Sequence, residues 1–236
     1  CFESGSVKST YGTGCFLMLN TGKNLVTSKN KLLTTIAYKL DGDITYALEG
    51  SIFVAGSSIQ YLRDKLNFFN SAEESEKFAL EADPSSQVFV VPAFTGLGAP
   101  HWKPEAKGAI FGLTLNSGIN EISLATLESV AFQTKELLNA MQADGAKVNS
   151  IKIDGGMSNN AFFSQLLADT LKTEIYKPKD IETTALGATY LAAIGSGFAK
   201  QDDLKDFWNM DKKFLPENNL DQKFAAWQKY LKKLIQ

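Results

Sequence analysis

A threonine between two glycines precedes the first apolar run of the sequence, in the stretch TYGTGCF at residues 10–16. Glycine permits tight turns and lets another molecule come close to the main-chain amides. The hydroxyl of Thr13, with Gly12 and Gly14 on either side, therefore suits a contact with phosphate. A glycine-rich turn between two apolar strands has the same pattern, and this stretch taken alone favours such a plain hairpin.

A second candidate lies in IKIDGGMSNN at residues 151–160, where a predicted strand runs into Asp154 and two glycines. Gly155 and Gly156 would stand at the carboxyl end of the strand, and Ser158 is a natural N-cap for a following helix. Main-chain amides and the helix dipole favour an anion at such a position. A turn in which the glycines serve only the backbone conformation, without a ligand, is an equally good interpretation.

Two glycines are each followed four residues later by a carboxamide, Gly56 by Gln60 and Gly156 by Asn160. Residues i and i+4 share one face of a helix, so each pair would make a flat patch with an amide one turn along. Such a patch suits a purine. Close helix packing at the glycine, with a solvated amide, is the alternative for either pair alone, but two pairs together favour a nucleotide.

Other common sites are absent from the sequence. It contains no G-x-x-x-x-G-K-[ST] loop and no G-x-S-x-G elbow, and GLGAPHWK lacks the third glycine of a dinucleotide fingerprint. His101 has no evident acid or nucleophile as a partner, so we interpret it as a loop residue beside Trp102. Together with Cys1 and Cys15 it does not form a zinc set, and we expect no metal bound by protein side chains.

Composition narrows the class of protein. The 236 residues include 24 basic and 26 acidic ones, for a net charge of -2, which argues against nucleic acid as a partner. No stretch approaches the roughly 20 apolar residues of a membrane span. We expect free thiols and a cytoplasmic protein.

The order of the elements predicts an α/β fold. Residues 6–48 hold β-prone runs separated by NTGK and DGD, which indicates an antiparallel meander. A helix is predicted within residues 50–69, where Ile52, Phe53, Ile59, Leu62 and Leu66 have helical spacing, and a short charged helix follows.

Beyond these come a strand, a long loop over residues 95–114 and a long helix, after which strands and helices alternate. Alternation implies crossover connections in a layered domain. An antiparallel meander followed by βαβ units and flanking helices on a mixed sheet is the order of a ribonuclease H-like, or actin-like ATPase, domain. We expect residues 1–236 to form one such domain.

The sequence is similar to the carboxy-terminal domain of the glycerol kinases, within the FGGY carbohydrate kinases. The resemblance covers essentially residues 5 to 200. It is carried by these stretches: STYGTGCFLMLNTG, YALEGSIFVAGSSIQYLRD, VPAFTGLGAPHWKPEAKGAIFGLT, DGGMSNN and TALGATYLAAIGSGF.

The resemblance implies an enzyme that moves the terminal phosphoryl group of ATP, held with Mg²⁺, to glycerol. It implies that Thr13 contacts the nucleotide phosphates and that Gly56, Gln60, Gly156 and Asn160 hold the adenosine. In this family the polyol-binding residues and the catalytic base precede the YGTGC motif, so we assign no catalytic residue here and expect the isolated chain to be nearly inactive. The missing amino-terminal domain would then be a partner, and a homo-oligomer stays open.

Two other functions remain as alternatives. The chain could belong to another FGGY kinase that acts on a pentulose or gluconate, or to a non-catalytic actin-like module that binds nucleotide. The lysine-rich end KFAAWQKYLKKLIQ is predicted to be an amphipathic helix, with Phe224, Trp227, Leu231 and Leu234 on one side. We expect that side to pack back onto the domain.

Overall fold

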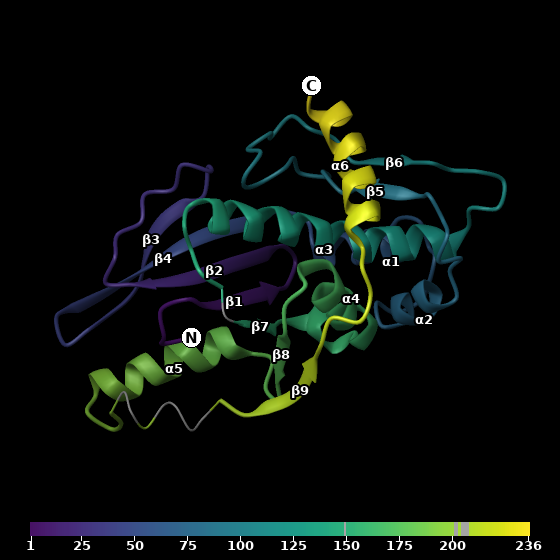
Figure 1. The fold of residues 1–236 in the computed structure, drawn as a ribbon. Coiled ribbons are helices and arrows are strands. Elements are labelled where there is room, and N and C mark those ends of the chain that lie inside the picture. Colours follow the sequence, from purple (N-terminus) through teal and green to yellow (C-terminus); the bar gives the residue numbers. More distant parts are fainter. Residues whose placement is uncertain (149, 201–202, 204–207) are drawn as a thin grey trace.

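The first part of the chain folds as an antiparallel meander (Figure 1). The computed structural model describes residues 1–148, 150–200, 203 and 208–236. The four strands of the meander are β1 (Ser6–Tyr11), β2 (Cys15–Gly22), β3 (Leu33–Leu40) and β4 (Asp43–Ile52). Alternate side chains of β1 are buried, which is the period of a strand with one face on a core. The predicted meander is therefore confirmed.

Two short helices, a small hairpin and a long helix follow. They are α1 (Gly56–Asp64), α2 (Glu74–Leu80), β5 (Phe89–Val91), β6 (Ala109–Phe111) and α3 (Ile119–Ala143). β5 and β6 pair with each other in a separate two-stranded sheet.

Two expectations for this region were wrong. The predicted helix does not include Ile52 and Phe53, because Ile52 is still paired with Cys15 at the end of β4. The stretch expected to be one long loop contains β6.

The last part of the chain contains the crossover units. It consists of β7 (Ser150–Asp154), the 3₁₀ helix η1 (Gly156–Asn159), α4 (Ala161–Leu171), β8 (Ile175–Pro178) and α5 (Thr183–Gly195). β7 pairs in parallel with β1 on one side and with β8 on the other. These parallel pairs confirm the predicted βαβ order.

Two further elements close the chain, β9 (Met210–Phe214) and α6 (Asp221–Ile235). β9 was not predicted, and it pairs antiparallel with β8 at the edge of the sheet. The complete seven-stranded sheet has the order β3-β4-β2-β1-β7-β8-β9. None of the helices in the described part of the chain has both the length and the apolar character to cross a membrane.

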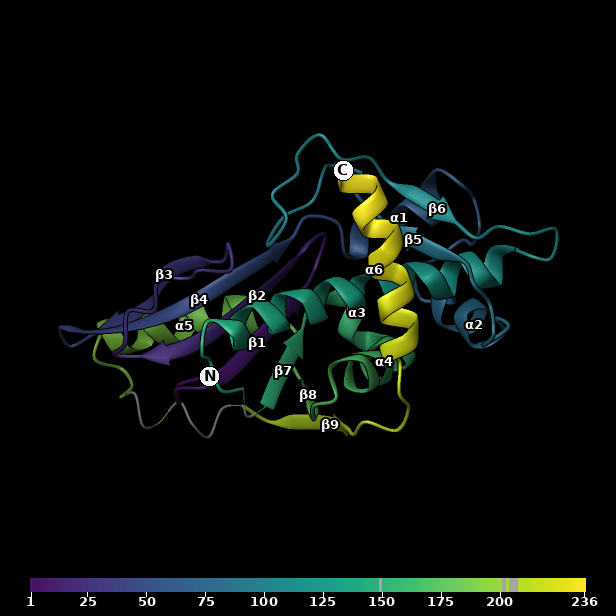
Figure 2. The same cartoon turned by 45° about the horizontal axis from the view of Figure 1, so that its top comes forward.

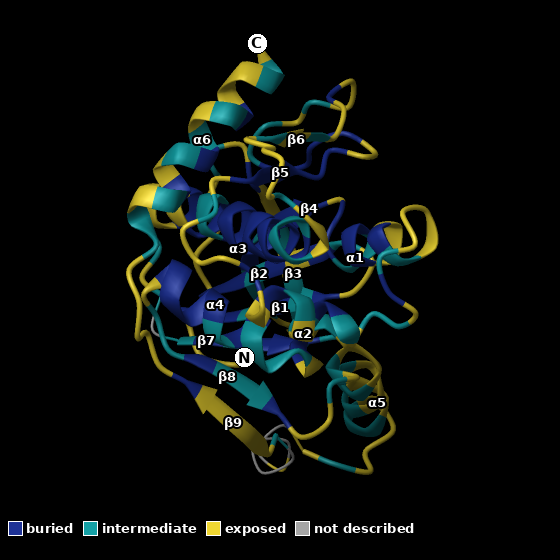
Figure 3. Cartoon of the chain, turned by 90° about the vertical axis from the view of Figure 1, so that its right-hand side faces the viewer, coloured by how far each residue is buried: buried dark blue, intermediate teal, exposed yellow. Residues whose placement is uncertain are grey.

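The helices lie on the two faces of this sheet in unequal number. α3 and α4 pack on one face, and the main core lies between them and the sheet, as the buried residues in Figure 3 show. α5 lies on the opposite face (Figures 1 and 3). α6 crosses α3 (Figure 2) and buries Phe224, Trp227 and Leu231, so its predicted apolar side packs back onto the chain.

Candidate functional site

A cavity of about 350 Å³ opens where four segments meet. These segments are the β1–β2 turn, the first turns of α1, the start of α2, and η1 with the start of α4. All five residues singled out in the sequence lie on its wall: Thr13, Gly56, Gln60, Gly156 and Asn160. The fold thus brings together residues that are up to about 150 positions apart in the chain.

Thr13 stands at the tip of the turn between β1 and β2. Its carbonyl oxygen accepts hydrogen bonds from the main-chain amides of Ala55 (2.9 Å) and Ser57 (3.1 Å), and from the Ser57 hydroxyl (2.8 Å). These bonds fix the turn against the start of α1. The Thr13 residue is exposed, and its own hydroxyl forms no hydrogen bond with any residue that the structure describes, so it is available to a ligand.

The two glycines of the turn have different roles. A Cβ atom on Gly12 would meet nothing closer than 4.0 Å, so this residue faces open space. A Cβ atom on Gly14 would lie 2.5 Å from the main-chain oxygen of Ile52. Gly14 is therefore needed where the turn packs against the end of β4, whatever ligand the turn binds.

The two glycines of the turn after β7 also differ in their roles. Gly155 has a φ of +84°, and a Cβ atom there would lie 2.5 Å from the main-chain oxygen of Tyr11. Its backbone thus packs directly on the end of β1, as only glycine allows. A Cβ atom on Gly156 would meet nothing within 4 Å, so the surface of this residue is open to the cavity.

The capping residue of α4 differs from the prediction. Ser158 lies inside η1, and its hydroxyl donates to the carbonyl oxygen of Gly155 (2.7 Å). Asn160 is the N-cap, since its Oδ1 accepts a hydrogen bond from the amide of Phe163 (2.7 Å). Asn160 makes the cap in place of Ser158 because the 3₁₀ helix occupies residues 156–159.

Only one of the two glycine and carboxamide pairs lies on a single helix. Gly56 begins α1 and Gln60 follows one turn later, as predicted. Gly156 and Asn160 do not lie on one helix, because η1 ends between them. The Oδ1 of Asn160 is used in the cap, so only its Nδ2 has no hydrogen bond to the described residues. Both pairs nevertheless reach the same cavity.

The start of α2 contributes residues that the sequence reasoning missed. Glu73, Ser75 and Glu76 line the cavity, and Oε1 of Glu76 accepts a hydrogen bond from the amide of Phe162 (3.0 Å) in α4. The acidic first turn of α2 was visible in the sequence, but no pattern placed it near the glycine turns. The main-chain amide of Glu73 and then the Ser71 hydroxyl lower the pKa of the Glu73 carboxyl, so it is ionised. The part of the cavity wall that α2 supplies therefore carries negative charge.

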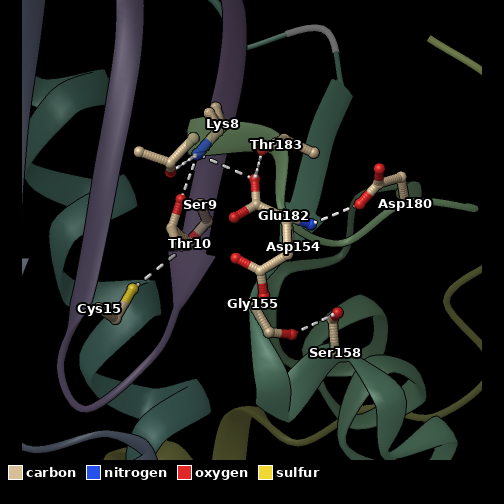
Figure 4. Close-up of polar contacts among 11 residues, drawn as sticks. Lys8, Ser9, Thr10, Cys15, Asp154, Gly155, Ser158, Asp180, Glu182 and Thr183 are labelled. Atoms are coloured by element: carbon tan, nitrogen blue, oxygen red, sulfur yellow. Dashed lines mark hydrogen bonds and ion pairs between the residues drawn. The ribbon is translucent and has the colours of Figure 1, made fainter. Parts of the chain in front are cut away.

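Asp154, the last residue of β7, is only 2% exposed. Its Oδ2 receives Nζ of Lys8 (2.9 Å) and the Thr183 hydroxyl (2.5 Å), so it joins β1, β7 and α5 (Figure 4). Its Oδ1 is buried without a partner among the described residues. Asp154 does not line the cavity, and the contacts that it makes join strands and a helix of the fold.

The turn that contains Thr13 does not fit a metal ion held by protein side chains. Carboxylates are the side chains that usually hold Mg²⁺, and residues 10–16 contain none. Among the described residues there is no group of three or more His, Cys, Asp or Glu side chains that could hold a metal ion. Burial raises the pKa of Cys15, at the base of the turn, to about 12, so its thiol is neutral.

His101 has a partner that the sequence did not reveal. Its Nε2 lies 2.7 Å from Oε2 of Glu136 in α3, so the expectation that no acid pairs with it was wrong. Neither residue lines the cavity. The pair joins the loop before β6 to α3 and is away from the candidate site.

Comparisons with known proteins agree with this geometry. Residues 7–196 match the model of the FGGY family of carbohydrate kinases, C-terminal domain. The chain is 48% identical over 238 residues to glycerol kinase 1 of Pseudomonas aeruginosa, covering 99% of this chain and 48% of that protein. It is 50% identical over 232 residues to a glycerol kinase of Alteromonas mediterranea, covering 97% of this chain and 47% of that protein. The chain thus spans about half the length of the curated relatives it matches.

Solved structures show the same fold. The crystal structure of Plasmodium falciparum glycerol kinase with ADP matches with a TM-score of 0.90 and 36% identity, over 99% of this chain and 48% of that one. A ligand-bound xylulose kinase from Lactobacillus acidophilus matches with a TM-score of 0.79 and 21% identity, over 98% of this chain and 46% of that one, which shows the fold alone. These matches confirm the actin-like α/β fold expected from the sequence.

Proposed function

Because this chain belongs to the FGGY family of carbohydrate kinases, whose carboxy-terminal domain it matches, we propose that it is the nucleotide-binding half of an ATP-dependent glycerol kinase. In that reaction a glycerol hydroxyl attacks the terminal phosphorus of ATP and loses its proton. The bond from that phosphorus to the bridging oxygen breaks, and the products are glycerol 3-phosphate and ADP. We propose that residues 1–236 form one domain, and that the enzyme works in the cytoplasm, where ATP is supplied.

The convergence of the five sequence-predicted residues on one cavity carries this proposal. Gly12 and Gly156 leave its wall open where a ligand would touch main chain, and the Thr13 hydroxyl is free to donate to a phosphate oxygen. Gln60 and Asn160 supply amide groups on either side. Together these features suit a nucleotide whose adenosine lies between the two glycines and whose phosphates extend toward Thr13.

Charge favours one direction for the bound nucleotide. Glu73 and Glu76 line the part of the cavity that α2 supplies, and their carboxylates repel phosphate. The adenosine would therefore lie at the α2 end and the phosphates at the turn that contains Thr13. Phosphoryl transfer also needs a positioned nucleophile and charge neutralisation, and the turn that contains Thr13 has neither a base nor a carboxylate for Mg²⁺. The chain alone would bind nucleotide better than it catalyses transfer.

The preference for glycerol over a sugar rests on sequence identity. Curated glycerol kinases are 47% to 50% identical to this chain, whereas the xylulose and gluconate kinases with solved structures are at about 21%. A substrate panel on the longer polypeptide that carries this chain tests this choice. Phosphorylation of a pentulose without phosphorylation of glycerol would contradict it.

The decisive experiment is a calorimetric titration of the 236-residue chain with ADP in Mg²⁺ buffer, with GDP as the control for base choice. We expect saturable binding of one ADP per chain and weaker binding of GDP. The longer polypeptide is titrated in parallel, because a site that needs the other half to close would bind only there. Absence of ADP binding in both forms would overturn the proposal.

A further inference from the structure

Glu76 is a carboxylate of α2 that the fold holds in a fixed position on the cavity wall. Its Oε1 accepts a hydrogen bond from the main-chain amide of Phe162 in α4 (3.0 Å), and the residue lines the cavity. Its Oε2 has no hydrogen bond with any residue that the structure describes. One oxygen therefore anchors the side chain, and the other is available to a ligand.

Asn160 makes the neighbouring contact at the same end of α4. Its Oδ1 accepts a hydrogen bond from the amide of Phe163 (2.7 Å), the residue directly after Phe162. Glu76 and Asn160 thus satisfy two consecutive amides, which are then not available to a phosphate, although a helix amino terminus often binds one. The two side chains leave a ligand one donor, Nδ2 of Asn160, beside one acceptor, Oε2 of Glu76.

A donor next to an acceptor matches one edge of adenine. Along this edge adenine has N7, which accepts, beside the 6-amino group, which donates, whereas guanine has two acceptors, N7 and O6. A purine ring also needs apolar surroundings. The same cavity provides them through Ile59, Ala72, Leu127 and Met157.

We propose that Glu76 is a specificity-determining residue, which selects nucleotides whose purine has an amino group at position 6. This inference rests on the proposed function and deepens it. Nδ2 of Asn160 donates to N7, and the 6-amino group donates to Oε2 of Glu76. A 6-oxo purine would instead place its O6 against the carboxylate, so two acceptors would face each other without a hydrogen bond.

The other acidic residue of the wall, Glu73, is less suited to this role. It is exposed, and its carboxyl already interacts with its own main-chain amide and with the Ser71 hydroxyl. Nothing that the structure describes joins it to α4. Glu73 therefore adds negative charge, whereas Glu76 has a fixed oxygen beside Asn160.

Glu76→Gln tests this assignment, because the Phe162 amide still needs an acceptor. The oxygen of the new side chain should stay on that amide, which leaves its NH₂ group to face the cavity as a donor. We expect the variant to bind ADP at least tenfold more weakly than the unsubstituted protein does. It should bind IDP, whose base has O6 in place of the amino group, at least tenfold more tightly.

Calorimetric titrations of the 236-residue chain and of the longer polypeptide measure these affinities. The melting temperature of Glu76→Gln should not change, since the bond to Phe162 is kept. Glu74→Gln is the matched control: Oε1 of Glu74 accepts from the amide of Ser71 (3.2 Å), and Glu74 does not line the cavity. This control should keep the ratio of ADP affinity to IDP affinity.

The outcomes separate this inference from the proposed function. Equal affinity of the unsubstituted protein for ADP and IDP would overturn the inference without any substitution. An unchanged ratio in Glu76→Gln, or the same shift in Glu74→Gln, would also overturn it, while ADP binding itself would still support the proposed function. Absence of ADP binding by both unsubstituted forms would overturn the proposed function and the inference with it.

Discussion

The two adjacent glycines in the turn after β7 have different roles. Gly155 is required by its positive φ and by the backbone of Tyr11, whereas the surface of Gly156 is open to the cavity. The same contrast separates Gly14 from Gly12 in the first turn. Each turn therefore contains one glycine that the fold needs and one that a ligand can use.

This contrast makes Gly156→Val and Gly155→Val a matched pair of variants. We expect Gly156→Val to fold normally and to lose at least tenfold in ADP affinity, about 1.4 kcal/mol, because its side chain fills the cavity. Gly155→Val should instead lower the free energy of unfolding by about 1–3 kcal/mol through backbone strain. Calorimetry and urea unfolding measure the two effects. Unchanged ADP affinity in Gly156→Val would remove this residue from the site.

The sequence singled out five residues that line one cavity, but it did not reveal the structural roles of their neighbours. Thr13, Gly56, Gln60, Gly156 and Asn160 stand out because glycine and a hydroxyl or amide recur at short spacing. The structural role of Gly14 depends on the close approach of β4, and the role of Glu73 depends on the packing of α2, which are long-range contacts. No local pattern records such contacts.

At the scale of elements, Asn160 belongs both to the cavity wall and to the helix that follows. Its Oδ1 caps α4, which leaves its Nδ2 for a ligand. A loss of ADP affinity on truncation of this side chain could thus come from either role. The two roles can be separated because aspartate also makes a good N-cap.

We expect Asn160→Ala to lower the free energy of unfolding by about 1 kcal/mol through loss of the cap, and to weaken ADP binding as well. Asn160→Asp should keep the stability while still weakening ADP binding, because it replaces the donor with a charged acceptor. Thermal unfolding and calorimetry on both variants give the comparison. Full ADP affinity in Asn160→Asp would show that Nδ2 makes no contact with the nucleotide.

Most elements were predictable from their periodicity, and the errors have physical causes. The apolar run IFVA, residues 52–55, continues from the end of β4 up to the start of α1, so spacing alone could not show where the strand ends at Ile52. β9 has only Phe214 buried among its five residues. Its backbone pairing with β8, rather than any alternation of side chains, makes it a strand.

At the scale of the whole molecule, Asp221 ties the last helix to the rest. Oδ1 of Asp221 receives Nζ of Lys135 from α3 (2.8 Å), and Oδ2 contacts Lys172 at the end of α4. The hydrogen bonds from Lys135 and then Lys172 lower the pKa of the Asp221 carboxyl to about 2. Trp227 in the same helix is fully buried, and its Nε1 donates to the carbonyl oxygen of Val90 (2.8 Å).

These contacts predict a dependence of stability on acid. A carboxyl whose pKa is lower in the folded state stabilises the fold at pH values above its unfolded pKa of about 3.9, and loses this contribution as the pH falls toward 2. We expect Asp221→Asn to be less stable than the unsubstituted chain above pH 4, and the difference to shrink between pH 4 and pH 2. Urea unfolding across this range measures it.

The control is Asp43→Asn, which removes an ion pair with Lys23 between largely exposed side chains. Pairs of this kind contribute little to stability, so this variant should follow the unsubstituted chain at every pH. A gap between Asp221→Asn and the unsubstituted chain that stays constant down to pH 2 would contradict the role given to Asp221.

The overall architecture was predictable because a meander followed by crossover units allows few arrangements. The position of β1 at the centre of the sheet, between β2 and β7, is a property of the whole chain. It depends on pairing residues such as Ser6 and Ser150, which no local pattern links.

That central place of β1 has a consequence for the order in which the molecule forms during synthesis. One edge of β1 pairs with β2, which follows it directly in the sequence, whereas its other edge pairs with β7, which is synthesised much later. Chains with such distant pairings fold slowly and expose apolar surface while they wait. The cavity exists only after Gly155 has packed against Tyr11. The rate at which ligand binding appears would therefore measure how fast this late contact forms.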